Sequence, residues 1–214
     1  MSVKPEITYE LLQEKHLEQT INCLVNVLTN AEPMLAAMKL TPSEFYPFAE
    51  AICEKAIQDN FSHIAIDAAT SPIIGTIISD DLSTELPSEI PLGFTEKSFA
   101  IFQLLNELHE QYLIKKKPVT SQVFHILSLA VEEPYRNRNI ANNLIRKNLE
   151  VARQENFSEV IVEASGNISQ HLFRKYGFED ICSIDYQTYE YKEIQVFEQI
   201  KEHRSCILME KVFN

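Results

Sequence analysis

Apolar residues recur every three or four positions in four segments of the chain, and this is the period of one buried face of an α-helix. The segments that show this spacing are residues 17–28, 45–56, 101–112 and 141–152. The second of these helices is expected to start at Thr41 and Pro42, because threonine is a good N-cap and proline fits the first helical position. A shorter helix is expected over residues 168–176, capped by Gly177.

Short apolar runs between these helices predict the strands. Residues 63–68 and 73–78 flank a turn around Ser71-Pro72 and are expected to pair as a hairpin. Residues 123–131 (VFHILSLAV) form the longest apolar run, which is typical of a strand buried on both faces. Further strands are expected at residues 3–9, 160–162, 178–184 and 206–212, and a loop at residues 80–97.

The order of these elements predicts an α/β fold. Strand–helix–strand units in the second half imply a mixed sheet covered by helices. The chain has 214 residues, 45% of them hydrophobic, which is enough for one full core. Since no repeat or linker divides it, one domain over residues 1–214 is expected.

Composition excludes several functional classes. A net charge of −12 argues against nucleic acid as a partner, because phosphate binding requires a basic face. No apolar run is long enough to span a bilayer and no signal segment opens the chain, so a cytoplasmic protein without a membrane partner is expected. The cysteines lack zinc-site spacing and are expected to be reduced thiols, with no metal site. The few glycines fit neither a dinucleotide fingerprint nor a P-loop.

The junction after residues 123–131 is the strongest candidate for binding chemistry. A buried strand there leads into a polar turn and then a helix N-terminus, where free backbone N–H groups and the helix dipole favour an anion. Arg136 and Arg138 add positive charge to this turn. The pattern predicts a phosphate or pyrophosphate site, and a solvated helix start is the alternative.

Residues 129–141 (LAVEEPYRNRNIA) resemble the acetyl-CoA signature of the GNAT superfamily, a strand followed by [RQ]-x-x-G-x-[GA] and a helix. Arg136 and Ala141 match this signature, while Asn139 stands where the family usually has glycine. Asparagine tolerates left-handed backbone, so the loop is still expected to form. The resemblance implies a GNAT-like fold: a central, mostly antiparallel, twisted sheet of about seven strands flanked by helices.

Residues 169–178 (SQHLFRKYGF) are similar to the superfamily's second signature, a helix ending in K-x-G-F. Many members have a tyrosine at the position of Phe173, and that tyrosine protonates the leaving thiolate. Phenylalanine has no proton to donate, so the role is vacant here or filled by another group. The resemblance assigns to acetyl-CoA the residues Leu129, Ala130, Val131, Arg136, Asn137, Arg138, Asn139, Ile140, Ala141 and Phe173.

A narrower resemblance is to the arylalkylamine (dopamine-type) N-acetyltransferases of insects. Glu32-Pro33-Met34 resembles their E-P-L motif, whose glutamate is the general base, and a helical insertion at about residues 81–120 agrees. Ser165 and Ser169 match two serines of that group, one or both of which are implicated there in the proton steps or in ordering the site. The alternatives are that Glu32 is a solvent-facing acid before a proline turn and that the serines cap a helix.

Other polar and aromatic residues carry weaker predictions. His125, inside an apolar strand, is interpreted as a core or pocket histidine rather than a base, and His171 as part of a solvated helix face. Tyr186, Tyr189 and Tyr191 are expected either to line an acceptor pocket or to lie in an exposed loop. Phe45, Tyr46 and Phe48 are expected either to line that pocket or to pack in the core, and core packing is favoured.

The resemblance implies an acetyl-CoA-dependent N-acetyltransferase acting on a primary amine by direct attack in a ternary complex. An arylalkylamine is the leading acceptor class and a polyamine the next. The alternatives are a catalytically silent GNAT-fold module that binds an acyl-CoA, and, less favoured, a protein-lysine acetyltransferase. A monomer or a homodimer is expected.

Overall fold

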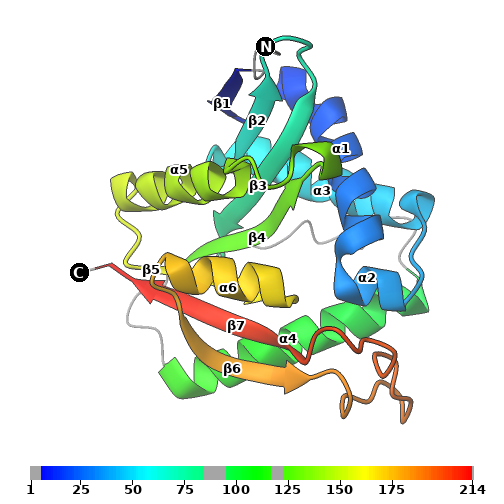
Figure 1. Ribbon diagram of the computed structural model, residues 1–214. Coiled ribbons are helices and arrows are strands. Elements are labelled where there is room, and N and C mark those ends of the chain that lie inside the picture. Colours follow the sequence, from blue (N-terminus) through cyan, green and yellow to red (C-terminus); the bar gives the residue numbers. More distant parts are fainter. Residues whose placement is uncertain (1–5, 84–94, 117–122, 214) are drawn as a thin grey trace.

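The computed structural model describes residues 6–83, 95–116 and 123–213. These residues form one seven-stranded sheet in the order β1-β2-β3-β4-β5-β7-β6 (Figure 1). Neighbouring strands are antiparallel except β4 and β5, which are parallel. The strands are β1 (Ile7–Leu11), β2 (His63–Asp67), β3 (Ile73–Asp81), β4 (Val123–Val131), β5 (Glu159–Ala164), β6 (Glu179–Asp185) and β7 (Ser205–Val212). The predicted mixed, mostly antiparallel sheet is confirmed.

Helices cover both faces of this sheet. The helices are α1 (Leu17–Ala31), α2 (Pro33–Ala37), α3 (Pro42–Asp59), α4 (Glu96–Lys116), α5 (Ile140–Gln154) and α6 (Asn167–Lys175). Side chains of α1 to α4 share one buried core, and those of α5 and α6 share a second core on the opposite face. In Figure 1, α5 and α6 lie in front of the sheet while α4 runs below it along β6 and β7. No helix in the described ranges is long and apolar enough to cross a membrane.

The helix starts follow local capping chemistry. Thr41 caps α3 as predicted, and a reciprocal pair of hydrogen bonds with Glu44 completes a capping box. Gly177, with φ of 79°, ends α6 as predicted. The one-turn helix α2 was not predicted, because five residues are too few to show a helical period. It begins where the sequence indicated only a break at Glu32-Pro33.

Several predicted boundaries differ from the structure. The first strand runs over Ile7–Leu11 rather than residues 3–9, and residues 1–5 lie outside the described part. Of the loop predicted at residues 80–97, Asp80 and Asp81 belong to β3 and residues 84–94 lie outside the described part. All four cysteines are free and buried, as predicted.

Candidate active site

The two parallel strands at the centre of the sheet separate halfway along their length. Pairing between β4 and β5 ends at Ile126 and Val162. Ile126 and Ser128 pair with consecutive residues of β3, so Leu127 between them forms a β-bulge in β4. Beyond this bulge β4 remains paired with β3, whereas β5 continues only with β7. The sheet therefore opens at its middle.

A cavity of about 460 Å³ lies at this opening. Much of its wall is apolar and comes from α1 to α4, including the rings of Phe45, Phe48 and Phe102. Its polar wall consists of Glu32, Glu44, Ser98, Asn106, His109, His125, Ser128, Glu163, Ser165 and Ser169. This combination, an apolar pocket with a few converging polar groups, is typical of a small-molecule site.

Glu32 places a buried carboxylate on the cavity wall. It is the N-cap of α2, where Oε2 accepts a hydrogen bond of 2.6 Å from the backbone N–H of Leu35. Oε1 is buried without a hydrogen-bond partner among the described residues. Burial raises the pKa of this carboxyl, and the N–H groups of Leu35 and Met34 and the hydroxyl of Ser165 offset part of the rise. The alternative of a solvent-facing acid is wrong.

Two serines on the same wall have different surroundings. Ser165 is the neighbour whose hydroxyl lowers the pKa of Glu32, and its carbonyl accepts a hydrogen bond of 2.8 Å from the Tyr186 hydroxyl. Ser169 donates to the carbonyl of Gly166 at 2.8 Å and accepts from the Gly166 N–H at 3.3 Å. The capping interpretation therefore holds for Ser169, which also lines the cavity.

The loop before α5, predicted to bind an anion, has the left-handed backbone that was expected at Asn139. Asn137 and Asn139 both have left-handed backbone, with φ of 62° and 66°, and Asn139 is the N-cap of α5. Arg136 is exposed and its Nε donates to the carbonyl of Val131 at 3.4 Å. Arg138 is exposed with its guanidinium 5.0 Å from the ring centre of Tyr135. Both cations are thus held beside the start of α5 with donors available to an anion.

The start of α5 packs closely against β3 at Gly75. Gly75 was not identified from the sequence as part of the site. A Cβ on Gly75 of β3 would lie 3.1 Å from the carbonyl oxygen of Ala130 and 3.2 Å from Ile140. Only glycine permits this approach without displacement of the neighbours. Its isolated position inside an apolar run is the sequence signal for it.

The half of β4 that is not paired with β5, and Phe173, are the remaining residues that were predicted to bind acetyl-CoA. Leu129 lines the cavity and Ser128 Oγ is buried there without a hydrogen-bond partner among the described residues. Phe173 is 1% exposed, packs edge-on against Phe178 with ring centres 5.1 Å apart, and also lines the cavity. Ser165 and Ser169 line the same cavity as Phe173.

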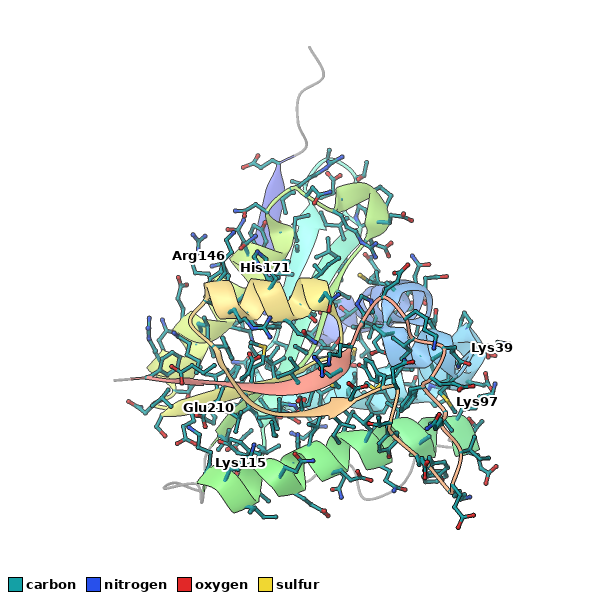
Figure 2. The ribbon with its side chains drawn as sticks, turned by 60° about the horizontal axis from the view of Figure 1, so that its bottom comes forward. Lys39, Lys97, Lys115, Arg146, His171 and Glu210 are labelled. Carbon is teal, nitrogen blue, oxygen red and sulfur yellow. The ribbon has the colours of Figure 1, made fainter. Side chains whose placement is uncertain are left out.

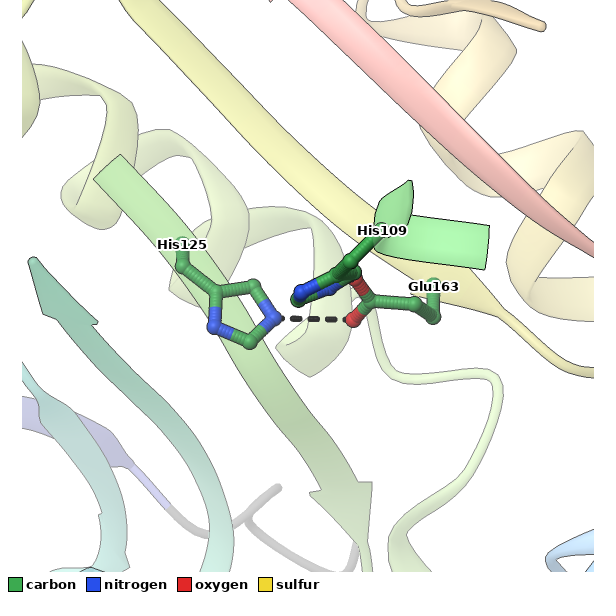
Figure 3. A group of neighbouring side chains, drawn as sticks. All are labelled: His109, His125 and Glu163. Atoms are coloured by element: carbon green, nitrogen blue, oxygen red, sulfur yellow. Dashed lines mark hydrogen bonds and ion pairs between the residues drawn. The ribbon is translucent and has the colours of Figure 1, made fainter. Parts of the chain in front are cut away.

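A third polar group on the wall is built from three separate elements (Figure 3). His125 on β4 contacts Asp80 Oδ1 through Nδ1 at 3.1 Å and Glu163 Oε2 through Nε2 at 2.8 Å. His109 on α4 contacts the other oxygen of Glu163. We call His109, His125 and Glu163 the His–Glu cluster. His125 is a pocket histidine, as predicted.

The charges within this cluster compensate one another. Burial opposes protonation of His125, but the carboxylates of Glu163 and Asp80 together raise its pKa to about 10. Burial likewise opposes ionisation of Glu163, yet the two imidazoles hold the pKa of this carboxyl well below its usual range. His109 and Glu163 could not be selected from the sequence, because they lie far apart in the chain and belong to no local motif.

Burial decides the aromatic predictions for Tyr186, Tyr189, Phe45 and Phe48, whereas Tyr46 and Tyr191 are half-buried and do not line the cavity. Tyr186 and Tyr189 are 0% and 5% exposed and pack against Phe197, so they neither line the cavity nor sit in an exposed loop. Phe45 and Phe48 belong to the main core and also line the cavity, so both interpretations hold for them. His171 is exposed on the outer face of α6, as predicted (Figure 2).

Known proteins share this arrangement. The acetyltransferase (GNAT) family model matches residues 40–178. Arylalkylamine N-acetyltransferase 2 from Aedes aegypti is 26% identical with a TM-score of 0.85, covering 98% of this chain and 100% of that one. Two further structures share the fold at lower identity. The C-terminal condensation domain of Ebony in complex with beta-alanyl-dopamine is 18% identical, with a TM-score of 0.85 over 98% of this chain and 100% of that one. Drosophila melanogaster polyamine N-acetyltransferase, which forms N-acetylagmatine, is 15% identical, with a TM-score of 0.80 over 97% of this chain and 100% of that one.

Proposed function

This chain belongs to the GNAT family of acetyltransferases, and we propose that it transfers the acetyl group of acetyl-CoA to the primary amine of a small arylalkylamine. The observation that carries the proposal is the buried carboxylate of Glu32, whose Oε1 has no partner within the described residues, on the wall of an aromatic cavity. An amine arriving as an ammonium ion supplies the missing hydrogen-bond donor.

The residues at the opening of the sheet fit acetyl-CoA. Beyond Leu127, no strand of the described residues pairs with β4 on its β5 side, so the extended pantetheine arm has an edge to pair with. The left-handed backbone at Asn137 and Asn139 and the side chains of Arg136 and Arg138 suit a pyrophosphate at the start of α5. When bound, acetyl-CoA supplies an activated acyl group as a thioester.

Glu32 is the proposed general base. A primary ammonium group with a pKa of about 10 cannot attack a carbonyl until it loses a proton. Oε1 of Glu32 takes that proton, directly or through a water, and the raised pKa of this carboxyl makes it a stronger base than an exposed glutamate. The free amine attacks the thioester carbonyl carbon and forms the C–N bond, its nitrogen loses a second proton to solvent, and the C–S bond breaks to release the thiolate.

The proton that Glu32 accepts has a short route to the departing sulfur. Ser165 borders the Glu32 carboxyl, and its hydroxyl is the proposed donor to the thiolate. Glu32 returns its proton to Ser165, so that the free enzyme is regenerated. A backbone N–H on the open edge of β4 is the proposed donor to the carbonyl oxygen as negative charge develops there.

The cavity wall favours an aromatic acceptor over a polyamine. Phe48 and Phe102 meet edge-on with ring centres 5.1 Å apart, an arrangement that accommodates another ring. A polyamine carries a second ammonium that needs a free carboxylate. Besides Glu32, the carboxylates on the described wall are already engaged: Glu44 with Thr41 and Lys97, and Glu163 with two histidines.

The proposal is tested by release of CoA from acetyl-CoA, followed with a thiol reagent, over a panel of arylalkylamines, polyamines and a lysine peptide. Turnover is expected on an arylalkylamine, with kcat/KM reduced on the order of 10²- to 10⁴-fold in Glu32→Gln, the scale for losing a general base. Glu18→Gln, an exposed acid on α1, is the matched control and is expected to leave the rate unchanged.

Other outcomes separate the alternatives. Turnover confined to polyamines moves the acceptor class to that group. Binding of acetyl-CoA without turnover of any amine favours the silent module. Full activity of Glu32→Gln on an arylalkylamine rejects Glu32 as the base, even if the acceptor class is right.

A further inference from the structure

The His–Glu cluster brings two imidazoles and one carboxylate to a single point on the cavity wall. His109, His125 and Glu163 come from α4, β4 and β5, and their facing ligand atoms all lie within 4.8 Å of one another (Figure 3). Two imidazole nitrogens and a carboxylate oxygen form a ligand set that Zn²⁺ uses when it keeps an open coordination position. The spacing of the cysteines gives no information about a site of this kind, which uses no cysteine.

An outer carboxylate already orients one of these imidazoles. Asp80 Oδ1 lies 3.1 Å from Nδ1 of His125 and is itself buried. Histidines that bind metals almost always donate the second ring N–H to a carboxylate or carbonyl, which fixes the ring and its tautomer. With one proton held on Nδ1 by Asp80, Nε2 is the nitrogen that becomes a ligand when the ion displaces the proton it shares with Glu163. Lys55 Nζ, 3.8 Å from Asp80 Oδ2, adds a contact on the far side of this carboxylate.

The spacing of the ligand atoms needs little adjustment to hold an ion. Zn²⁺ binds nitrogen and oxygen at about 2.0–2.2 Å, so tetrahedral ligand atoms lie roughly 3.3–3.6 Å apart. Nε2 of His125 is 2.8 Å from Oε2 of Glu163, and His109 contacts the second oxygen of the same carboxylate. The His125–Glu163 pair reaches the required geometry by separating roughly 0.5–0.8 Å, and the His109–Glu163 pair by separating somewhat further.

The cluster is largely buried and borders the cavity. The side chains of His125 and Glu163 are 9% and 8% exposed, whereas that of His109 is 27% exposed, and all three line the cavity. A bound ion would therefore have three protein ligands and face the cavity with its fourth position. Water or a nitrogen or oxygen atom of a bound molecule can occupy that position.

We propose that His109, His125 and Glu163 form a binding site for one Zn²⁺ ion that opens into the acceptor cavity. Glu163 and Ser165 are two positions apart at the end of β5, about 6–7 Å along an extended chain. An ion at the cluster therefore lies on the same wall as the carboxylate of Glu32. If the proposed function holds, zinc and the amine compete for this cavity.

The binding test uses metal-free protein with neither substrate present, so it does not depend on the proposed function. Zn²⁺ is titrated calorimetrically, and Co²⁺ is titrated while its visible d–d absorption is recorded. One site per chain is expected, with an intense Co²⁺ band that indicates four or five ligands rather than six. Zn²⁺ is expected to displace Co²⁺ and abolish the band.

Three variants locate the site. Asp80→Asn, which alters the outer carboxylate, is expected to weaken Zn²⁺ binding by ~10–100-fold, and His109→Ala, which removes a ligand, by more than that. His171→Ala removes an exposed histidine on α6 and is expected to change nothing. Thermal unfolding of each variant without metal shows that the fold is retained. Absence of Zn²⁺ binding, or equal affinity in wild type and His109→Ala, overturns the proposal.

Competition is measured separately, with an arylalkylamine that the enzyme turns over. Inhibition by Zn²⁺ is expected to be relieved by raising the amine concentration, and to be lost in His109→Ala at the same Zn²⁺ concentration. Inhibition that does not respond to the amine would place the ion elsewhere and reject its position on the acceptor side of the cavity.

Discussion

Glu32 combines a functional requirement with a cost in stability. Its pKa is raised because burial penalises the carboxylate, so the carboxyl ionises less readily in the folded than in the unfolded chain. The stability associated with such a group is present below its unfolded pKa and is lost as the pH rises through its folded pKa. The partner that would offset this cost is the acceptor amine, which is absent from the free enzyme.

Glu32→Gln is therefore expected to stabilise the protein while lowering its activity. The amide does not ionise, and its oxygen can still accept the hydrogen bond from Leu35 that caps α2. The difference in melting temperature between the variant and wild type should grow as the pH rises through the folded pKa of Glu32. Thermal unfolding across a pH series measures it.

Glu44→Gln is a control in which the change in stability is expected to have the opposite sign. Hydrogen bonds from Thr41 and Lys97 lower the pKa of Glu44 to about 2. Its contribution is thus present above the unfolded pKa and disappears as the pH falls toward 2, so this variant should be less stable than wild type at neutral pH. A Glu32→Gln variant that is destabilised at high pH would contradict the assignment of Glu32 as a buried acid whose burial cost is only partly offset.

The two serines of the site are separable by their effects on Glu32. The Ser165 hydroxyl lowers the pKa of the Glu32 carboxyl, so Ser165→Ala should move the acid limb of the pH profile of kcat/KM to higher pH. Ser169 bonds to Gly166 at the start of α6, so Ser169→Ala should lower stability by about 1 kcal/mol and leave the limb in place. Equal shifts in both variants would contradict this division.

At the residue scale, only the site residues that belong to short local motifs could be identified from the sequence. Glu32 and the arginines of the loop were identified from short contiguous patterns. His109 and Glu163 were not, because their proximity arises only when α4 packs beside the parted strands. A helix and a strand separated by 54 positions carry no signal of contact in a single sequence.

At the scale of elements, the position of the site depends on one irregularity in one strand. The sequence predicted β4 as a continuous apolar run, and burial on both faces holds for its first half, Val123 to Ile126. The bulge at Leu127 and the end of pairing with β5 were not predictable, because an extra residue in a strand leaves the apolar run unchanged. The cavity exists because the two strands part there.

The loop before α5 offers a test at the same scale. Asn139 has a left-handed backbone, which costs an ordinary residue about 1–2 kcal/mol and glycine almost nothing. Asn139→Ala is expected to lower both stability and affinity for CoA, whereas Asn139→Gly should retain both. Calorimetric titration with CoA and thermal unfolding measure the two effects.

Asn156 supplies the matched control for this loop. It has φ of 63° just after the C-terminal end of α5, at the opposite end of that helix. Asn156→Ala should therefore carry the same backbone cost in stability and leave the dissociation constant of CoA unchanged. If both alanine variants weaken CoA equally, the effect comes from general destabilisation and not from the anion loop.

For the whole molecule, periodicity and connection order were sufficient to predict the sheet and its covering helices. The strand order, with β7 between β5 and β6, was not predicted, because pairing partners depend on contacts between distant segments. The resemblance supplied the mostly antiparallel sheet that element order alone left open. Fold class follows from local patterns, whereas the cavity follows from how distant elements meet.

The net charge of −12 predicts opposite salt effects on the two substrates. The long-range field attracts a cationic amine and repels anionic CoA, while only the local arginines favour the phosphates. Raising the ionic strength from about 0.01 to about 0.1 M shortens the Debye length from about 30 to about 10 Å and screens the long-range part. At saturating acetyl-CoA, kcat/KM for the amine should then fall by at least about twofold. At saturating amine, kcat/KM for acetyl-CoA should stay constant or rise, and a parallel fall in both would mean that salt acts on the chemistry or the fold and not on steering.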